Sequence, residues 1–311
     1  MVSSPLASSG RIHRLSAFLY GRRRLRLALF LAVPVFWLVG VYGGSLLSLL
    51  TQSFFRLDSF AGTIDRTFTL ATWRELFTAA NMAVVGRTVG MATAVTLASV
   101  VIALPLAYYI ARFASKRLKG WMVLAVLLPL WSSYLVRVYA WKLILAAEGI
   151  INWFFSRLGL GGVLGAILDV PVIGGPSLSV SYLGQFVVFL YIWLPYMILP
   201  VVTALERVPG SYLEASADLG ARPLTTFRRV VWPLAIPGVA AGSIFTFSLT
   251  LGDYIIPTVI GDSSPFIGLA IYSQQGVAGN LPLAAAFAFV PIAIMAVYLT
   301  VARRLGAFEA I

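Results

Sequence analysis

Six long apolar segments alternate with polar ones along the 311-residue chain. A helix needs about 20 predominantly apolar residues to cross the hydrocarbon core of a bilayer. The pattern therefore predicts membrane-spanning helices over residues 27–50, 83–111, 121–146, 181–205, 234–258 and 282–302. Arg137 interrupts the third segment, and Pro237 and Pro257 interrupt the fifth. The first segment is longer than the core of a signal peptide and no small-residue cleavage site follows it, so we expect a retained span.

Composition supports a membrane protein. The chain is 60% hydrophobic and 11% charged, against roughly 45–50% and about 25% in soluble domains. It has no cysteine, and its one histidine is His13, which excludes disulfides and cysteine- or histidine-cluster metal sites. None of the three lysines follows a glycine, so the chain has no phosphate-binding loop for ATP. No motif suggests catalysis.

The net charge of +12 is better explained by membrane orientation than by nucleic-acid binding. Cytoplasmic loops of membrane proteins are enriched in Lys and Arg. If both termini are cytoplasmic, 16 of the 23 basic residues lie on that side. These are Arg11, Arg14, Arg22, Arg23, Arg24, Arg26, Arg112, Lys116, Arg117, Lys119, Arg207, Arg222, Arg228, Arg229, Arg303 and Arg304. The tail over residues 1–26 has an interfacial-helix pattern, although a solvated basic anchor explains it equally well.

The longest internal loop on that side, residues 206–233, is charged but not disordered in composition. Its stretch "SYLEASADL" predicts a short helix with Ser211 as N-cap and Glu214 three residues later, a capping-box pattern. Gly220 stands where a helix end favours glycine, and Pro223 fits the first turn of a second short helix. Two such short helices are marginal alone, which favours a docking element over a plain connection between spans.

This loop resembles the "EAA" loop of permease subunits in binding-protein-dependent ABC importers. Glu214, Ala215 and Ser216 occupy the Glu-Ala-Ala positions, and Gly220 and Pro233 match the pattern's glycine and proline. Three positions depart from the pattern, namely Ser216, Val230 and Trp232. The resemblance implies a coupling helix that seats on a separate ATPase, with contacts from Glu214, Ala215, Ser216, Asp218, Leu219, Gly220, Arg222 and Pro233.

The likeness extends over residues 83–303, the expected core permease domain. Segments 103–113, 124–152 and 247–274 resemble spermidine/putrescine-type permeases. The first span with its external loop, residues 27–82, matches less well, and residues 304–311 form a C-terminal tail.

The resemblance implies an all-α membrane protein with the six-span transmembrane domain of a type I ABC importer, in a bacterial inner membrane. This chain would bind no cofactor, because ATP and Mg would be held by the partner ATPase. The implied partners are a cytoplasmic ATPase dimer, a second and different permease chain and an external solute-binding protein.

Ionisable residues inside spans are costly, so each is a functional candidate. The candidates for the substrate pathway are Asp253, Tyr254, Arg137, Tyr134, Trp141 and Trp193. An Arg137–Asp253 ion pair with a structural role is an equal alternative. The aromatic residues could surround an organic cation, or they could belong to an ordinary membrane-interface belt.

A polyamine is the leading expectation for the substrate. Opines, other amino-acid derivatives and quaternary amines remain open. A self-sufficient secondary transporter or channel is the alternative function, although such carriers often carry inverted repeats, which are not evident here. Residues 159–177 are too rich in Gly and Pro for a span, and they predict a re-entrant or interfacial segment.

Overall fold

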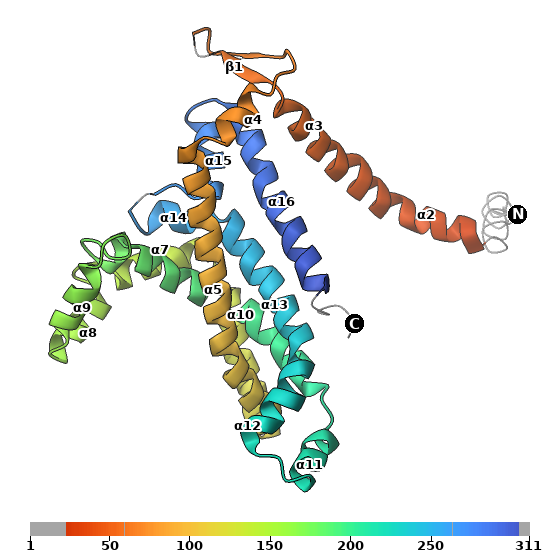
Figure 1. The fold of residues 1–311 in the computed structure, drawn as a ribbon, viewed down its shortest axis with the longest axis vertical. Coiled ribbons are helices and arrows are strands. Elements are labelled where there is room, and N and C mark those ends of the chain that lie inside the picture. The colour runs from red at the N-terminus through yellow and green to blue at the C-terminus, as the bar shows by residue number, and fades with distance from the viewer. Residues whose placement is uncertain (1–22, 59, 263, 305–311) are drawn as a thin grey trace, which may run out of the picture.

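A computed structural model describes residues 23–58, 60–262 and 264–304 (Figure 1). Most of the predicted N-terminal interfacial helix and of the C-terminal tail lies outside these residues. Within them, five helices are long and apolar enough to cross a membrane, and one bent helix pair makes a sixth candidate span. The mostly helical, six-span architecture predicted from the sequence is therefore confirmed.

The first span leans away from the rest of the molecule (Figure 1). It is one continuous rod made of α2 (Arg23–Val35), a π-helical stretch η1 (Phe36–Gly43) and α3 (Gly44–Gln52). No residue of η1 or α3 is buried. Its contact with the helical body is at the α3 end, against α16 (Leu281–Arg304).

A short β-hairpin follows the first span, which a purely helical prediction did not include. Strands β1 (Arg56–Asp58) and β2 (Thr63–Asp65) pair antiparallel, with Leu57 opposite Ile64. In the turn, the Asp58 carboxylate accepts hydrogen bonds from the backbone N–H groups of Phe60 and Ala61. These bonds favour the charged form and lower the pKa of the Asp58 carboxyl. The hairpin thus has a turn stabilised by its own acidic side chain.

The second and third predicted spans differ in regularity. After α4 (Ala71–Leu76), α5 (Ala79–Arg112) is one long helix. The prediction of a single helix over residues 121–146 was wrong. The chain there forms α6 (Lys116–Leu127), the 3-10 turn η2 (Leu128–Trp131) and α7 (Tyr134–Ile144), with a bend of 95° between the α6–η2 unit and α7. Pro129 lies in η2, where its ring removes a backbone donor and favours a break.

Short elements connect α7 to the fourth span. They are α8 (Ile150–Arg157), α9 (Gly161–Leu168) and the 3-10 turn η3 (Leu178–Val180), before α10 (Tyr182–Glu206). An eight-residue helix such as α9 is about 12 Å long, far less than the hydrocarbon core. The segment 159–177 is thus no span, as predicted.

The fifth span begins earlier and ends earlier than predicted. Beyond α11 (Gly210–Asp218), the chain forms α12 (Pro223–Thr226), the π-helical η4 (Phe227–Val231) and α13 (Trp232–Gly252), which join into one 30-residue helix. The predicted second short helix of the loop is therefore the first turns of this span. The helix stops at Asp253 and not at Pro257, which lies inside the separate α14 (Ile255–Val259).

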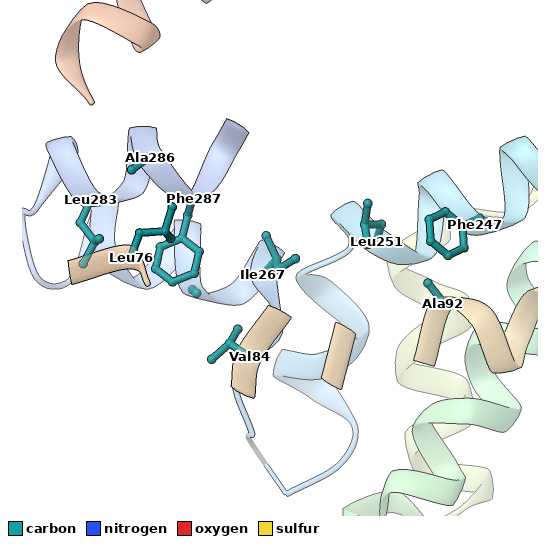
Figure 2. Packing of buried hydrophobic residues seen from close by; sticks show 10 residues of the cluster. Leu76, Val84, Ala92, Phe247, Leu251, Ile267, Leu283, Ala286 and Phe287 are labelled. Carbon is teal, nitrogen blue, oxygen red and sulfur yellow. The ribbon is translucent and has the colours of Figure 1, made fainter. Parts of the chain in front are cut away.

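The core has three parts along the bundle. Near the hairpin end, α4, α5, α13, α15 (Ile267–Gly276) and α16 bury a cluster that includes Leu76, Leu251 and Phe287 (Figure 2). A second cluster surrounds Phe189 and Phe266 beside α7. At the opposite end, the last turns of α5 and α10 pack against the first turns of α13. Helices α5, α10 and α13 thus form the central unit to which other elements attach.

Close packing of α10 on α13 depends on two glycines. Gly238 and Gly242 are four residues apart, the small-xxx-small spacing that lets membrane helices approach closely. A Cβ atom at Gly238 would stand 2.6 Å from both the Ala204 Cβ atom and the Pro200 carbonyl oxygen, and one at Gly242 would stand 2.7 Å from the Met197 sulfur. The close approach of α10 therefore leaves no room for a larger side chain at Gly238 or Gly242 of α13.

This packing generates a prediction with an internal control. Gly238→Ala should destabilise the protein by about 1–3 kcal/mol, because an overpacked core must shift backbone atoms. The chain has a second pair at the same spacing, Gly86 and Gly90 in α5, where an added Cβ atom meets nothing within 4 Å. Gly86→Ala and Gly90→Ala should leave the unfolding temperature in detergent unchanged or raise it. Equal effects at both pairs would contradict the packing explanation.

Candidate functional site

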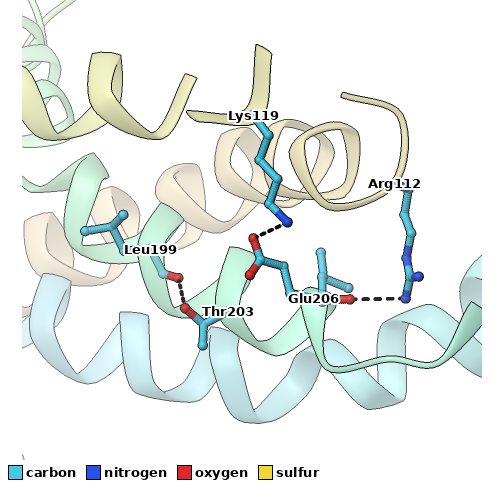
Figure 3. A network of polar contacts seen from close by, with 6 residues as sticks. Arg112, Lys119, Leu199, Thr203 and Glu206 are labelled. Carbon is cyan, nitrogen blue, oxygen red and sulfur yellow. Dashed lines mark hydrogen bonds and ion pairs between the residues drawn. The ribbon is translucent and has the colours of Figure 1, made fainter. Parts of the chain in front are cut away.

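The exit of α10 is fixed by two basic residues from the α5–α6 region. The Arg112 guanidinium donates to the carbonyl oxygens of Leu205, at 3.1 Å, and Val208, at 2.6 Å. Lys119 forms an ion pair with Glu206, with 2.9 Å between its Nζ and the carboxylate (Figure 3). Helix termini leave carbonyl groups without intrahelical partners, and Arg112 binds one of them at Leu205 and a loop carbonyl at Val208. The loop that follows is thus anchored at its first residues.

Helix α11 begins without the predicted capping box. Its N-cap is Pro209 with no side-chain hydrogen bond, and Ser211 already lies inside the helix. The prediction of Ser211 as N-cap was therefore wrong. Pro209 precedes the helix in an extended conformation, with φ −63° and ψ 140°, and the proline ring fixes that φ.

The end of α11 was predicted correctly. Gly220 has a φ of +72°, the left-handed conformation that favours glycine. Its N–H donates to the Ala217 carbonyl, and the Ala221 N–H donates to the Ser216 carbonyl, which is the Schellman pattern of helix termination. Ser216 and Thr226 share a hydrogen bond of 2.9 Å between their hydroxyl oxygens, which joins α11 to α12.

Between α11 and the first turns of α12–α13 lies an open hollow of about 960 Å³. Six of the eight predicted coupling residues line it, namely Ala215, Ser216, Leu219, Gly220, Arg222 and Pro233. Glu214 and Asp218 are not in its lining. They are four residues apart and so share another face of α11, where both are exposed. The predicted residues thus divide between a hollow and an acidic outer face.

Sequence reasoning missed part of this lining. The further residues are Tyr212, Ala221, Thr225, Arg229, Val230 and Leu234. Tyr212 precedes Ala215 and Ser216 by three and four residues, a helical spacing that could have indicated it. Arg112 and Lys119 lie about 90 residues earlier, and no sequence signal connected them to this loop.

Large apolar side chains are exposed at this tip of the molecule. Leu219 is 87% exposed, Leu224 is 62% exposed and Tyr212 is 53% exposed. Figure 1 shows α11 projecting beyond the ends of the long helices. An apolar patch rimmed by charged residues on a projecting helix is typical of a protein-interaction site.

The substrate-pathway candidates are partly brought together at the break after α13. Asp253 is 9% exposed, and its Oδ1 atom accepts from the backbone N–H groups of Ile255, at 2.8 Å, and Ile256, at 3.1 Å. Its Oδ2 atom accepts from the Tyr134 hydroxyl. The Tyr134 ring stacks on Trp193, with 5.7 Å between ring centroids. Asp253, Tyr134 and Trp193 therefore form one connected unit.

The remaining pathway candidates are placed elsewhere. Among the described residues, the only ion pair joins Lys119 and Glu206, so the suggested Arg137–Asp253 pair does not form. The buried Nε and Nη1 atoms of Arg137 have no hydrogen-bond partner in this part of the chain. Trp141 packs against Tyr191, with 5.0 Å between ring centroids, and Tyr254 stacks on Tyr272 at 5.1 Å. The Asp253 carboxylate is instead held by three protein donors. The Tyr134 hydroxyl binds Oδ2, and the backbone amides of Ile255 and Ile256 bind Oδ1.

The spans and the anchored helix α11 define a membrane protein of several spans with a short helix projecting from one end. Residues 100–308 match the family described as "Binding-protein-dependent transport system inner membrane component", and the chain belongs to this family. It is 53% identical, over all of both chains, to the inner membrane ABC transporter permease protein YdcU of Escherichia coli K12. It is 29% identical to the spermidine/putrescine transport system permease protein PotB of the same organism, over 69% of this chain and 74% of that one.

The fold is also found in a solved structure. A chain of a bacterial ABC transporter that imports the polysaccharide alginate superposes with a TM-score of 0.69 at 17% identity, over 94% of this chain and 99% of that chain. The chain is thus an inner-membrane permease subunit of an ABC importer, a translocation component and not an enzyme, whose system includes an ATPase and a solute-binding protein. The expectation from the sequence is confirmed. Family membership argues against the alternative of a self-sufficient secondary transporter or channel.

The break at Asp253 generates a second prediction. Tyr134→Phe removes the hydroxyl that donates to Asp253 but keeps the ring on Trp193, so a buried carboxylate oxygen loses its partner. Leaving such a group unsatisfied costs about 1–3 kcal/mol, and the unfolding temperature in detergent should fall. The control is Tyr139→Phe, on the same helix and 54% exposed, which should change nothing. Equal stability of the two variants would show that the Tyr134–Asp253 bond is not needed.

Proposed function

We propose that α11, the exposed tip and the hollow beside them are the site at which the partner ATPase docks. The exposed Leu219, Leu224 and Tyr212 support apolar contacts, and Glu214 and Asp218 add a negative face. The observation that carries this proposal is a rigidly held helix with a large apolar tip: anchored at Arg112, ended at Gly220 and joined to α12 by Ser216. A coupling element must be stiff, since a flexible loop would absorb the motion it should transmit.

The path of the motion follows from the chain's continuity. Helix α12 continues through η4 into α13 without interruption up to Gly252, so a displacement of the hollow's wall moves the span itself. That span ends at Asp253, beside Tyr134 and Trp193. A single helix thus connects the proposed docking site at its first turns to the pathway candidates beside its last turn. ATP and Mg would be bound by the ATPase dimer, and this chain would supply the lever.

Gly220 provides a direct test of the docking proposal. An added Cβ atom would meet nothing within 4 Å, so only the φ of +72° opposes substitution. A non-glycine residue in that region costs about 1–2 kcal/mol, whereas Asn tolerates it better. Gly220→Val should lower co-purification of the ATPase, or its stimulation by solute-loaded binding protein, about 5- to 30-fold. Gly220→Asn should retain most of both. Full coupling in the valine variant would contradict the proposal.

We further propose that both termini are cytoplasmic. This orientation places the α11 tip and its basic residues on the side where the ATPase works. The hairpin and the segments containing α8, α9 and α15 would then face the external binding protein. Six spans are few to enclose a solute path, and a second, different permease chain would complete it, as in systems with paired permeases.

For the substrate we propose a polyamine or a related small organic cation. The support is the likeness to PotB, a spermidine/putrescine permease, together with the chemistry at the α13 break. Asp253 supplies negative charge, and Tyr134, Trp193 and Tyr254 supply aromatic faces, which attract organic cations. Both oxygens of Asp253 already accept hydrogen bonds, so they hold a fixed position for a passing amine.

The substrate proposal predicts a specific defect. In vesicles containing the whole transporter and its binding protein, Asp253→Asn should lower ATP-driven putrescine uptake at least tenfold, because it removes the buried negative charge. Asp169→Asn, in the segment after α9, should leave uptake unchanged. ATPase activity without solute separates a pathway defect from failed assembly. Uptake of an opine, another amino-acid derivative or a quaternary amine, with none of putrescine, would refute the proposal.

A further inference from the structure

A second hollow, separate from the one beside α11, lies between α13 and α16. It has a volume of about 390 Å³ and is predominantly apolar. Its lining comprises Trp232, Ile236, Val239, Ala240, Ser243, Tyr298, Val301 and Ala302. The hydroxyl groups of two lining residues are paired, since the Tyr298 hydroxyl donates to the Ser243 hydroxyl oxygen at 2.7 Å. This groove therefore presents a hydrocarbon-like surface along its length.

The length of the groove corresponds to one leaflet of a bilayer. Trp232 and Ser243 mark its two ends on α13, and the eleven steps along the helix from one to the other rise about 16 Å. Half of the hydrocarbon core is about 15 Å. Trp232 is 36% exposed at the end nearer the α11 tip, and tryptophan is enriched at the membrane–water interface. The groove thus runs from one interface to the middle of the membrane.

The interfacial end of the groove is strongly basic. Arg228 precedes Trp232 by one helical turn, and Arg303 and Arg304 directly follow the lining residue Ala302. All three side chains are exposed. Residues 223–252 and 281–304 contain no Asp or Glu, and the one ion pair among the described residues, Lys119–Glu206, lies elsewhere. This positive charge is thus not neutralised by the two helices that form the groove.

We propose that this groove binds one anionic phospholipid. An acyl chain lies along α13 and α16, and the phosphate is held by Arg303 and Arg304 with Arg228 beside it. Arginine forms charge-assisted, often bidentate hydrogen bonds with phosphate, and basic pockets between membrane helices hold lipid headgroups. A membrane helix of a neighbouring chain would fill only the apolar part, whereas an anionic lipid fills that part and also complements the exposed arginines, so charge complementarity favours the lipid. The site is independent of the transported solute.

The test measures lipid retention by the whole transporter. The complex is reconstituted in nanodiscs of phosphatidylglycerol and phosphatidylcholine in equal amounts, released in mild detergent and weighed by native mass spectrometry. The intact complex should retain phosphatidylglycerol and little phosphatidylcholine. Arg303→Gln with Arg304→Gln should lower that retention at least fivefold. Ala240→Leu, which fills the groove without changing charge, should do the same.

Matched controls separate the groove from general effects. Arg56→Gln with Arg74→Gln removes two arginines near the hairpin, and Ala296→Leu adds the same bulk on the opposite face of α16 from Tyr298. Neither control should change retention. The proposal is overturned if Ala240→Leu retains the lipid, if the controls lose it equally or if both lipids are retained alike. It is also overturned if Ala240→Cys, in a chain that otherwise has no cysteine and labelled with a photoactivatable maleimide, cross-links to another subunit's helix.

Discussion

Inside a membrane every backbone amide and carbonyl that leaves a helix must find a partner within the protein, because lipid offers none. The α13 break obeys that constraint, and at the ends of α10 and α11, which are proposed to lie in water, protein groups satisfy the chain as well. At the α13 break, Asp253 accepts the first amides of α14. At the end of α10, Arg112 donates to carbonyls that have no intrahelical donor. At the end of α11, Gly220 and Ala221 close the last turn. Each of these points is also a place where function is proposed.

Internal hydrogen bonds, and not the lipid constraint, explain why the loop over residues 206–233 is stiff. A loop of this length between spans could be disordered, yet Arg112 binds the Leu205 and Val208 carbonyls, a Schellman turn ends α11 and the next helix begins at Pro223. The close contact of α10 with α13 at Gly238 and Gly242 then ties this region to the central bundle. Motion at the α11 tip and motion of the spans are therefore mechanically coupled. The anchors are side chains and turns, so the region can move as a unit without losing its internal bonds.

Two faces of the fifth span carry different surfaces. One face, with Arg229 and Pro233, lines the coupling hollow, and the other, with Trp232 and Ile236, lines the apolar groove. The π-helical turn η4 lies where these faces begin, and its wider winding changes the angular spacing of residues there. A lipid in the groove would thus contact the helix that the ATPase is proposed to move. This arrangement makes the membrane a direct neighbour of the coupling machinery.

The sequence by itself predicted most of the spans, the mostly helical class and a short helix ended by Gly220, because each is a local pattern. Twenty apolar residues predict a span wherever they fold, and Gly220 is needed for a backbone conformation set by its own turn. The N-cap of α11 was predicted wrongly because two nearby residues can begin a helix. Ser211 is a good N-cap residue, but the helix begins after Pro209.

Only the tertiary structure decided which residues meet. The Arg137–Asp253 pair was reasonable by charge, yet Tyr134 reaches the carboxylate because the third span bends by 95°. Arg112 and Lys119 join the coupling site from about 90 residues away, through the packing of α5 and α6 on α10. The groove between α13 and α16 likewise exists only where two separate helices lie side by side. Such contacts depend on distances between segments remote in sequence, and no local periodicity specifies these distances.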